Sequence, residues 1–142
     1  MIRVTRRYAF SASHRLHAAD LPEDENRRLY GKCNNPFGHG HNYVLEVSVR
    51  GPVDPRSGRA VDPAALDRLV GERVIREFDH KNLNEQIQEF ERVVPTTENL
   101  GLLIHQRLKQ TWHTEFPEDL PALEKVRIAE TERNIFEVRS LS

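Results

Sequence analysis

Apolar and polar residues alternate in two segments near the start of the chain. In residues 3–12 the apolar side chains fall mainly on even positions, and in residues 41–51 they fall mainly on odd positions. A period of two is typical of a strand that buries one face and exposes the other. Both segments are therefore predicted to be half-buried strands. The apolar positions are Val4, Tyr8 and Phe10 in the first, and Tyr43, Leu45, Val47 and Val49 in the second.

A spacing of three or four residues replaces this alternation in the middle of the chain. Residues 61–78 show it after Asp62, a good N-cap residue that stands directly before a proline. Residues 95–112 show it again, and either Thr96 or Thr97 can cap that segment. We expect two amphipathic helices. Their apolar positions are Leu66, Leu69, Val70, Val74 and Phe78 in the first, and Leu100, Leu103, Ile104 and Leu108 in the second.

Two shorter apolar runs, 126–129 and 135–138, predict a C-terminal hairpin. Residues 21–32 are polar and rich in turn-forming residues, which predicts a loop, and residues 79–84 interrupt the helical pattern. The expected order is strand, strand, helix, helix, strand, strand. Grouped helices favour an α+β fold with a four-stranded, mainly antiparallel sheet and two helices on one face. The length, 142 residues, suits one domain, residues 1–142.

Composition narrows the functional classes. The formal net charge is −1 and no basic tract is present, which argues against a general binder of nucleic acid or of anionic membranes. No segment approaches the roughly 20 apolar residues of a membrane span, and the N-terminus has no signal-like apolar run. A single cysteine cannot form an internal disulfide. A cytoplasmic setting is therefore expected.

Three histidines are candidate metal ligands. His39 and His41 are two positions apart at the entry to the second strand, so their side chains are expected on one face. His14 ends the first strand, which is the expected neighbour of the second. Three neutral imidazoles suit Zn²⁺ and leave a fourth position open, although Fe²⁺ and Cu²⁺ take the same ligands. The alternative is that these histidines are ordinary loop residues beside glycines.

Cys33 and a neighbouring Asp–His pair are the next candidates. Cys33 lies in a polar segment, where it can be a fourth metal ligand or a reactive thiol. Asp79 and His80 can act as a carboxylate and the imidazole that it orients. Glu98 and Glu130 are, by default, surface residues, but a carboxylate on a binding floor can accept two parallel N–H donors. The residues by themselves indicate a metal site and leave the role of Cys33 open.

Five short runs together resemble the 6-pyruvoyl-tetrahydropterin synthase family. They occur in the family order and extend over nearly the whole chain. The runs are FSASHRL (10–16), GKCNNPFGHGHNY (31–43), DHKNLN (79–84), PTTEN (95–99) and ETERNI (130–135). Each run is weak evidence by itself, and the specificity comes from their order and spacing.

The resemblance implies a fold, a reaction and a role for each candidate residue. The fold is the tunnelling (T-fold) unit, assembled as a homohexamer of two trimers with sites at subunit interfaces. The enzyme is a zinc-dependent lyase that releases triphosphate from 7,8-dihydroneopterin triphosphate, a step of tetrahydrobiopterin biosynthesis. The implied zinc ligands are His14, His39 and His41. The implied catalytic residues are Cys33 as the base and Asp79 with His80 as its proton relay. The implied substrate-binding residues are Glu130, Thr97 and Glu98, and the candidates for binding the triphosphate are Arg15, Arg6, Arg7 and Lys81.

Two alternatives stay open. The relative that makes 6-carboxy-5,6,7,8-tetrahydropterin for queuosine biosynthesis shares the zinc, the cysteine and the substrate. Cys33 stands six positions before His39, and this long spacer favours the pyruvoyl product. A relative that serves folate synthesis has glutamate in place of Cys33, which makes it a poor match. From a different class, the chain could be a non-catalytic, zinc-stabilised pterin-binding module, against which Cys33, Asp79 and His80 all argue.

Overall fold

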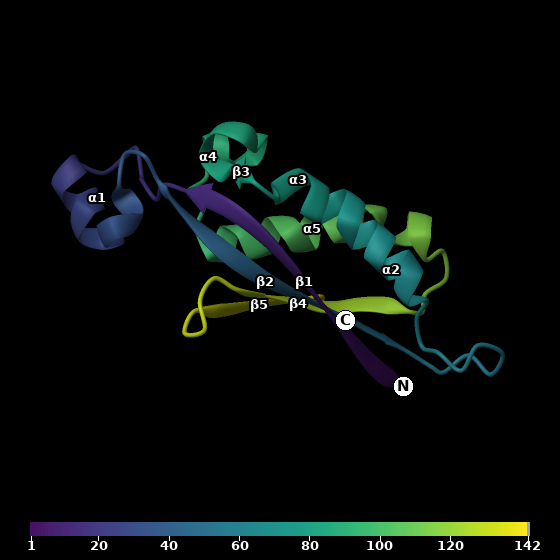
Figure 1. Ribbon diagram of the computed structural model, residues 1–142. Helices are drawn as coiled ribbons and strands as arrows, with labels where there is room; N and C mark the ends of the chain where they lie inside the picture. Colours follow the sequence, from purple (N-terminus) through teal and green to yellow (C-terminus); the bar gives the residue numbers. More distant parts are fainter. Residues whose placement is uncertain (142) are drawn as a thin grey trace.

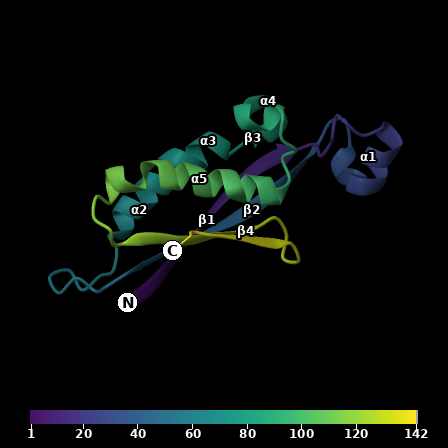
Figure 2. The ribbon, with the colours of Figure 1, turned by 180° about the vertical axis from the view of Figure 1, so that it is seen from behind.

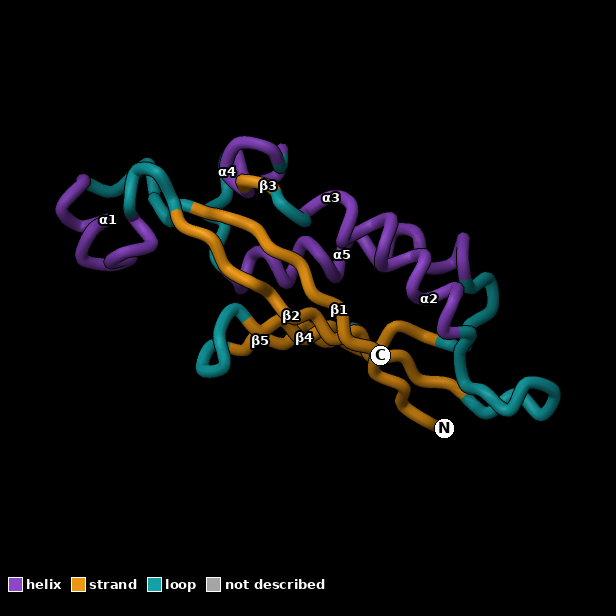
Figure 3. Tube along the Cα trace, in the orientation of Figure 1, coloured by secondary structure: helices purple, strands orange, loops and turns teal. Residues whose placement is uncertain are grey.

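A single twisted sheet organises the molecule (Figures 1 and 3). The computed structural model describes residues 1–141. Five strands lie in the order β3-β1-β2-β4-β5, and every neighbouring pair is antiparallel except β1 with β3. The strands are β1 (Ile2–His14), β2 (His39–Gly51), β3 (Lys81–Asn82), β4 (Ala122–Ala129) and β5 (Ile135–Arg139). The α+β prediction is confirmed, and the two-residue β3 adds one strand to the predicted four.

Helices cover one face of this sheet. Helix α2 (Pro63–Val70) continues through a π-helical turn (Gly71–Ile75) into α3 (Arg76–Phe78), and α5 (Thr97–Glu115) lies beside it on the same face (Figures 1 and 2). The shorter elements are α1 (Glu23–Tyr30), α4 (Leu83–Gln86) and 3-10 turns at Gly31–Asn34 and Gln88–Glu91. None of the helices in residues 1–141 combines the length and the apolar character that a membrane span requires.

Both long helices begin where the sequence predicts. Asp62 is the N-cap of α2, and its carboxylate accepts a hydrogen bond from the Ala64 amide at 3.0 Å. Thr96, rather than Thr97, caps α5, and its hydroxyl accepts from the Asn99 amide at 3.2 Å. Each cap satisfies one of the amides that a helix start leaves without an intrahelical partner.

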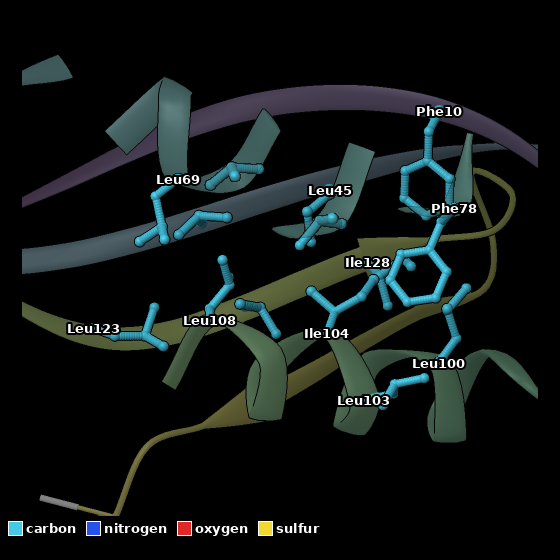
Figure 4. Close-up of a cluster of buried hydrophobic side chains, with 14 of the residues drawn as sticks. Phe10, Leu45, Leu69, Phe78, Leu100, Leu103, Ile104, Leu108, Leu123 and Ile128 are labelled. Carbon is cyan, nitrogen blue, oxygen red and sulfur yellow. The ribbon is translucent and has the colours of Figure 1, made fainter. Parts of the chain in front are cut away.

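The hydrophobic core fills the space between the helices and the sheet (Figure 4). It combines the alternating residues of β1, β2 and β4 with the apolar faces of α2 and α5, as the two periodicities predict. Leu45, Ile104 and Ile128 are completely buried at its centre. Its other large members include Phe10, Leu66, Phe78, Leu100, Leu103 and Leu108.

The prediction of a loop over residues 21–32 is wrong, because residues 23–30 form α1. This helix has no apolar stripe, since its only buried residue is Asn26. Three acidic residues in its first turn and two arginines in its last turn suit the helix dipole. Gly31 ends it with a φ of 56°. The side-chain amide of Asn26 forms hydrogen bonds with the backbone of Ala18, Leu21 and Pro22. These polar contacts, rather than an apolar face, attach α1 to the chain before it.

Candidate active site and metal centre

The register of β1 against β2 brings the three predicted histidines together. His14 pairs directly with His39, and His41 pairs with Ala12, two positions along the ladder. Opposite residues of an antiparallel pair project to the same face, as do residues two apart on one strand. All three imidazoles therefore point to the helix-covered side. Their ring centroids are 5.2 Å apart for His14 and His39, 4.9 Å for His14 and His41, and 4.5 Å for His39 and His41.

His14 is prepared to be a metal ligand. Its Nδ1 lies 2.9 Å from the carbonyl oxygen of Pro95, which selects the tautomer that donates from Nδ1. The lone pair of Nε2 is then free, and Nε2 is buried without a hydrogen-bond partner. The imidazole is 1% exposed, and burial lowers its pKa to about 4. A buried, neutral imidazole with an unused nitrogen fits a soft or borderline divalent cation such as Zn²⁺.

Cys33 lies at one side of the histidines. Its Sγ is 3.0 Å from Nε2 of His39. The carbonyl of Cys33 accepts a hydrogen bond from the Leu16 amide, and this bond joins the segment 31–38, here called the cysteine loop, to the chain just after β1. Gly38 makes the close approach of this loop possible. Its φ is 71°, and a Cβ there would lie 2.9 Å from the carbonyl oxygen of His14. Burial, and then the Glu130 carboxylate, raise the pKa of the Cys33 thiol.

Glu130 lies on the side of the histidines opposite to Cys33. Its Oε1 is 3.1 Å from Nε2 of His41, without the direction of a hydrogen bond, and its Oε2 accepts a hydrogen bond from the Thr97 hydroxyl. Burial is the main reason why the pKa of His41 is lowered. Thr97 is buried in the first turn of α5, and Glu130 follows β4 directly. Helix, hairpin and sheet thus meet at this carboxylate.

Two overlapping groups of side chains in residues 1–141 can hold a metal ion. His14, Cys33 and His39 form one, and His14, His41 and Glu130 form the other, with the ligand atoms of each group within 4.8 Å of one another. Both groups contain His14. Neither group contains all three histidines, because His39 and His41 belong to different groups that share His14. These side chains can therefore hold a metal ion, and Cys33 is one of the possible ligands.

Asp79 and His80 form their expected pair with each other. His80 Nδ1 lies 3.1 Å from Asp79 Oδ1, which also accepts from the Ser11 amide at 2.9 Å. This amide is the main cause of the lowered pKa of Asp79. His80 has a φ of 59°, its amide donates to the Ser11 carbonyl, and its side chain is 82% exposed. In the part of the chain that the structure describes, neither residue hydrogen-bonds Cys33.

The hollow beside this pair extends toward the histidines. It has a volume of about 490 Å³, and its lining includes His41 on β2 as well as His80 and Lys81 at the edge of the sheet. A larger cavity, of about 860 Å³, is lined mainly by residues 52–62. It contains none of the candidate ligands or catalytic residues, whereas the smaller hollow includes His41 and His80.

The other predicted substrate-binding residues, Thr97, Glu98 and Arg15, have different surroundings. Thr97 contacts Glu130, as described. Glu98 is exposed and has no hydrogen bond or ion pair within residues 1–141. Arg15 is held beside the cysteine loop, where its Nε donates to the carbonyl of Asn34 at 3.1 Å.

Two supporting residues were missed in the sequence. One is Pro95, whose carbonyl orients His14. The other is Asn84, whose side-chain amide accepts from the Arg15 amide at 2.7 Å and donates to the Arg15 carbonyl at 2.8 Å. Both lie inside runs that point to the family, PTTEN and DHKNLN. A backbone carbonyl leaves no trace in residue identity, whereas the amide-rich run around Asn84 could have been noticed.

Comparisons with known proteins agree with this arrangement. The family model described as 6-pyruvoyl tetrahydropterin synthase matches residues 3–140. The 6-pyruvoyl tetrahydrobiopterin synthase of Poecilia reticulata is 44% identical over 132 residues, which cover 93% of this chain and 86% of that protein. The Homo sapiens protein of the same name is 43% identical over 134 residues, with coverages of 93% and 87%.

A solved structure extends the similarity to three dimensions. The structure of Caenorhabditis elegans 6-pyruvoyl tetrahydropterin synthase superposes with a TM-score of 0.88 and 40% sequence identity, over 99% of this chain and 96% of that one. The match includes every element that contributes to the histidine cluster. The chain therefore belongs to the 6-pyruvoyl tetrahydropterin synthase family.

Proposed function

We propose that the chain is a 6-pyruvoyl-tetrahydropterin synthase. The reaction converts 7,8-dihydroneopterin triphosphate into 6-pyruvoyl-tetrahydropterin and inorganic triphosphate. The observation that carries the proposal is the spatial order of the cysteine, the histidines and the glutamate across the site. Cys33 lies 3.0 Å from His39 at one side of the histidine cluster, and Glu130 lies 3.1 Å from His41 at the other. A base and a pterin anchor therefore flank one metal-binding cluster.

We assign His14, His39 and His41 as the ligands of a zinc ion. Zinc is a Lewis acid that, when bound, makes the C–H protons beside coordinated hydroxyls more acidic. The chain's own contribution is to keep the imidazoles neutral and oriented. Burial and the Pro95 carbonyl do so for His14, and the strand register fixes the positions of the other two rings.

Cys33 is assigned as the base that removes a proton from the substrate side chain. As a thiolate it accepts a carbon-bound proton, and a proton returned to the pterin ring completes the reduction of the ring. The electron pair of the broken C–H bond passes into the pterin ring, so the side chain is oxidised to the ketone level as the ring is reduced. Triphosphate leaves with its C–O bond broken. No external oxidant or reductant is needed. Because burial raises the pKa of the free thiol, a cationic partner must favour the thiolate.

Glu130 is assigned as the anchor of the pterin ring. A carboxylate that accepts two parallel N–H donors matches the 2-amino group and N3 of the pterin. The hydrogen bond from Thr97 orients this carboxylate, and the side chain is only 14% exposed. Glu98 is assigned to the same pocket, Arg15 to the triphosphate, and Asp79 with His80 to the proton relay.

We further propose that the active form is a hexamer of two trimers in the cytoplasm. Within residues 1–141, strand β5 has a free outer edge, and β1 is covered on its outer side only by two residues of β3. Free edges are sites at which strands of further subunits can pair. A reducing compartment keeps the Cys33 thiol free, as the proposed role requires.

Product identification tests the reaction. The zinc-loaded protein is incubated with 7,8-dihydroneopterin triphosphate, and the products are analysed by mass spectrometry. Triphosphate together with 6-pyruvoyl-tetrahydropterin is the expected result. Release of acetaldehyde would instead identify the 6-carboxy-5,6,7,8-tetrahydropterin synthase reaction of queuosine biosynthesis. Substrate binding without turnover would favour the non-catalytic module.

Substitution of the cysteine tests its role. In Cys33→Ala we expect triphosphate release to fall about 10²–10⁴-fold, the usual contribution of a positioned base, while zinc content stays near that of the wild type. Zinc is measured by atomic absorption and turnover by phosphate analysis of the same samples. Loss of zinc from this variant would make Cys33 a ligand and would contradict its assignment as base.

A further inference from the structure

The spatial order of Glu130, the histidines and Cys33 indicates in which orientation the substrate binds. A chain of contacts runs from Glu130 to His41 and from His39 to Cys33, and the centroids of the two histidine rings are 4.5 Å apart. The substrate is also linear. Its ring is at one end, the hydroxyl-bearing carbons follow, and the triphosphate ends the side chain. If Glu130 holds the ring, the triphosphate extends beyond Cys33.

A positively charged cavity lies at that end. It has a volume of about 440 Å³, and its charged lining residues are Arg15, Arg27, Lys32 and Glu23. Lys32 directly precedes Cys33, and Arg15 directly follows His14. Three cations and one carboxylate give an excess of two positive charges. Helix α1, which supplies Arg27, lies beyond the paired ends of β1 and β2 (Figures 1 and 2).

The cations of this cavity have few partners of their own. The side chains of Arg27 and Lys32 make no hydrogen bond or ion pair within residues 1–141, and the guanidinium of Arg15 donates only through Nε, to the Asn34 carbonyl. Asn84 fixes the backbone of Arg15 from both sides. By contrast, Arg28, the next residue of α1, pairs with Glu25 at 3.1 Å. The lining cations are thus available for an anion.

Other cationic candidates are less well placed. Arg6 is bound by both oxygens of Asp67, and Arg7 pairs with Glu46. These arginines are also seven and eight positions before His14 on β1, roughly 23–26 Å along an extended strand. Lys81 is closer, but it lies with His80 in the hollow at the sheet edge. That hollow has one lysine where the α1 cavity has three cations.

We propose that the α1 cavity binds the triphosphate end of the substrate through Arg15, Arg27 and Lys32. This inference rests on the proposed function, and it extends that function from one predicted arginine to a site built mainly by the segment 23–36. Guanidinium and ammonium groups bind phosphate oxygens through charge-assisted hydrogen bonds. Helix α1 then has a role in binding, in the region that the sequence pattern marked as a loop.

Two single substitutions in the zinc-loaded protein test the site. Arg27→Ala and Lys32→Ala are compared with Arg28→Ala, which removes the same charge from the same helix outside the cavity. The dissociation constant of inorganic tripolyphosphate is measured by calorimetry, and that of 7,8-dihydroneopterin, which lacks phosphate, by fluorescence. Each cavity variant is expected to weaken tripolyphosphate binding about 5–10-fold, roughly one lost charge contact. Binding of 7,8-dihydroneopterin is expected to stay within twofold, and Arg28→Ala to match the wild type.

Turnover separates this inference from the proposed function. If the wild type converts 7,8-dihydroneopterin triphosphate, kcat/KM in the cavity variants is expected to fall by the same factor as tripolyphosphate affinity. Equal tripolyphosphate affinities in Arg27→Ala, Lys32→Ala and Arg28→Ala would overturn the inference, as would an effect confined to Lys81→Ala. A wild type that binds tripolyphosphate through these residues but shows no turnover would contradict the proposed function and leave the anion site supported.

Discussion

At the scale of single residues, His14 shows how a common side chain becomes specialised. Its position at the end of β1 places it among buried groups, and the Pro95 carbonyl fixes which nitrogen carries the proton. The unused Nε2 is left facing His39 and His41. His17, three residues later, bonds the Asn34 side chain through Nδ1 and takes no part in the cluster. Two histidines thus have different hydrogen-bond partners and different roles because the residues around them differ.

This contrast predicts different metal content in two matched variants. His14→Ala is expected to lose the zinc that we propose, whereas His17→Ala is expected to retain about one equivalent per chain. Because a metal that binds only the folded state stabilises it, added zinc is expected to raise the melting temperature of the wild type and of His17→Ala but not of His14→Ala. Metal analysis and differential scanning fluorimetry check both statements. Zinc loss in His17→Ala alone would refute the assignment.

At the scale of elements, the β1–β2 ladder has two ends with different tasks. Its His14–His39 end carries the site, and its other half is attached to the helix layer by Asp67 of α2. Asp67 accepts hydrogen bonds from Arg6 at 2.7 and 2.8 Å and from the Tyr8 hydroxyl at 2.7 Å. Neither Arg6 nor Asp67 follows from periodicity, since both occupy the inner face, where apolar residues are expected.

The attachment predicts a pH-dependent contribution to stability. The hydrogen bonds from Arg6, and then from Tyr8, hold the pKa of Asp67 below its ordinary value of 3.8. A lowered carboxyl pKa stabilises the fold above the unfolded-state value, and this stabilisation is lost as the pH falls through the folded-state value. Since the Arg6 and Asp67 side chains are 42% and 41% exposed, screening by solvent keeps this contribution small.

Asp67→Asn is therefore expected to be less stable than the wild type at pH 7 and to approach it as the pH falls below 3.8. Urea unfolding at several pH values measures the difference in the free energy of unfolding. Glu72→Gln, which changes an exposed carboxylate just after α2, is the control and is expected to match the wild type throughout. A deficit of Asp67→Asn that is constant with pH would show that the carboxylate charge contributes nothing.

At the scale of the whole molecule, no hydrogen bond or ion pair within residues 1–141 joins Asp79 or His80 to Cys33. Cys33 lies with the histidines, whereas Asp79 and His80 pair at the edge of the sheet, where His80 is 82% exposed. The hollow beside His80 reaches His41 on its inner side and is open to other molecules on its outer side. The geometry favours a site that another subunit of the proposed hexamer completes.

Mixing two inactive variants tests this arrangement. Cys33→Ala and His80→Ala are each expected to lose activity, but subunits that exchange during joint refolding can form sites with an intact Cys33 from one chain and an intact His80 from another. Random assembly restores about a quarter of the sites. Triphosphate release from the mixture, relative to each variant refolded alone, is the measurement. An inactive mixture whose subunits have exchanged would place both residues in one chain.

The sequence by itself determined the long strands and helices and the identity of the chemical groups. Alternation set the strands, three-to-four spacing set the helices, and Asp62 and the threonine pair marked the helix starts, because these signals depend on near neighbours in the chain. The histidine cluster also followed from sequence, since two strands in register place His14 opposite His39. The family runs then supplied roles that spacing could not assign.

Only the tertiary structure decided what depends on contacts between distant segments. It brought the Pro95 carbonyl to His14, Asp67 to Arg6 of β1, and the Ser11 amide to Asp79. It also turned a polar segment into α1, because the buried Asn26 bonds the chain beside it and no periodic apolar face is required. Long-range polar contacts are specified by geometry after the chain has folded, and so they leave no local pattern from which they can be predicted.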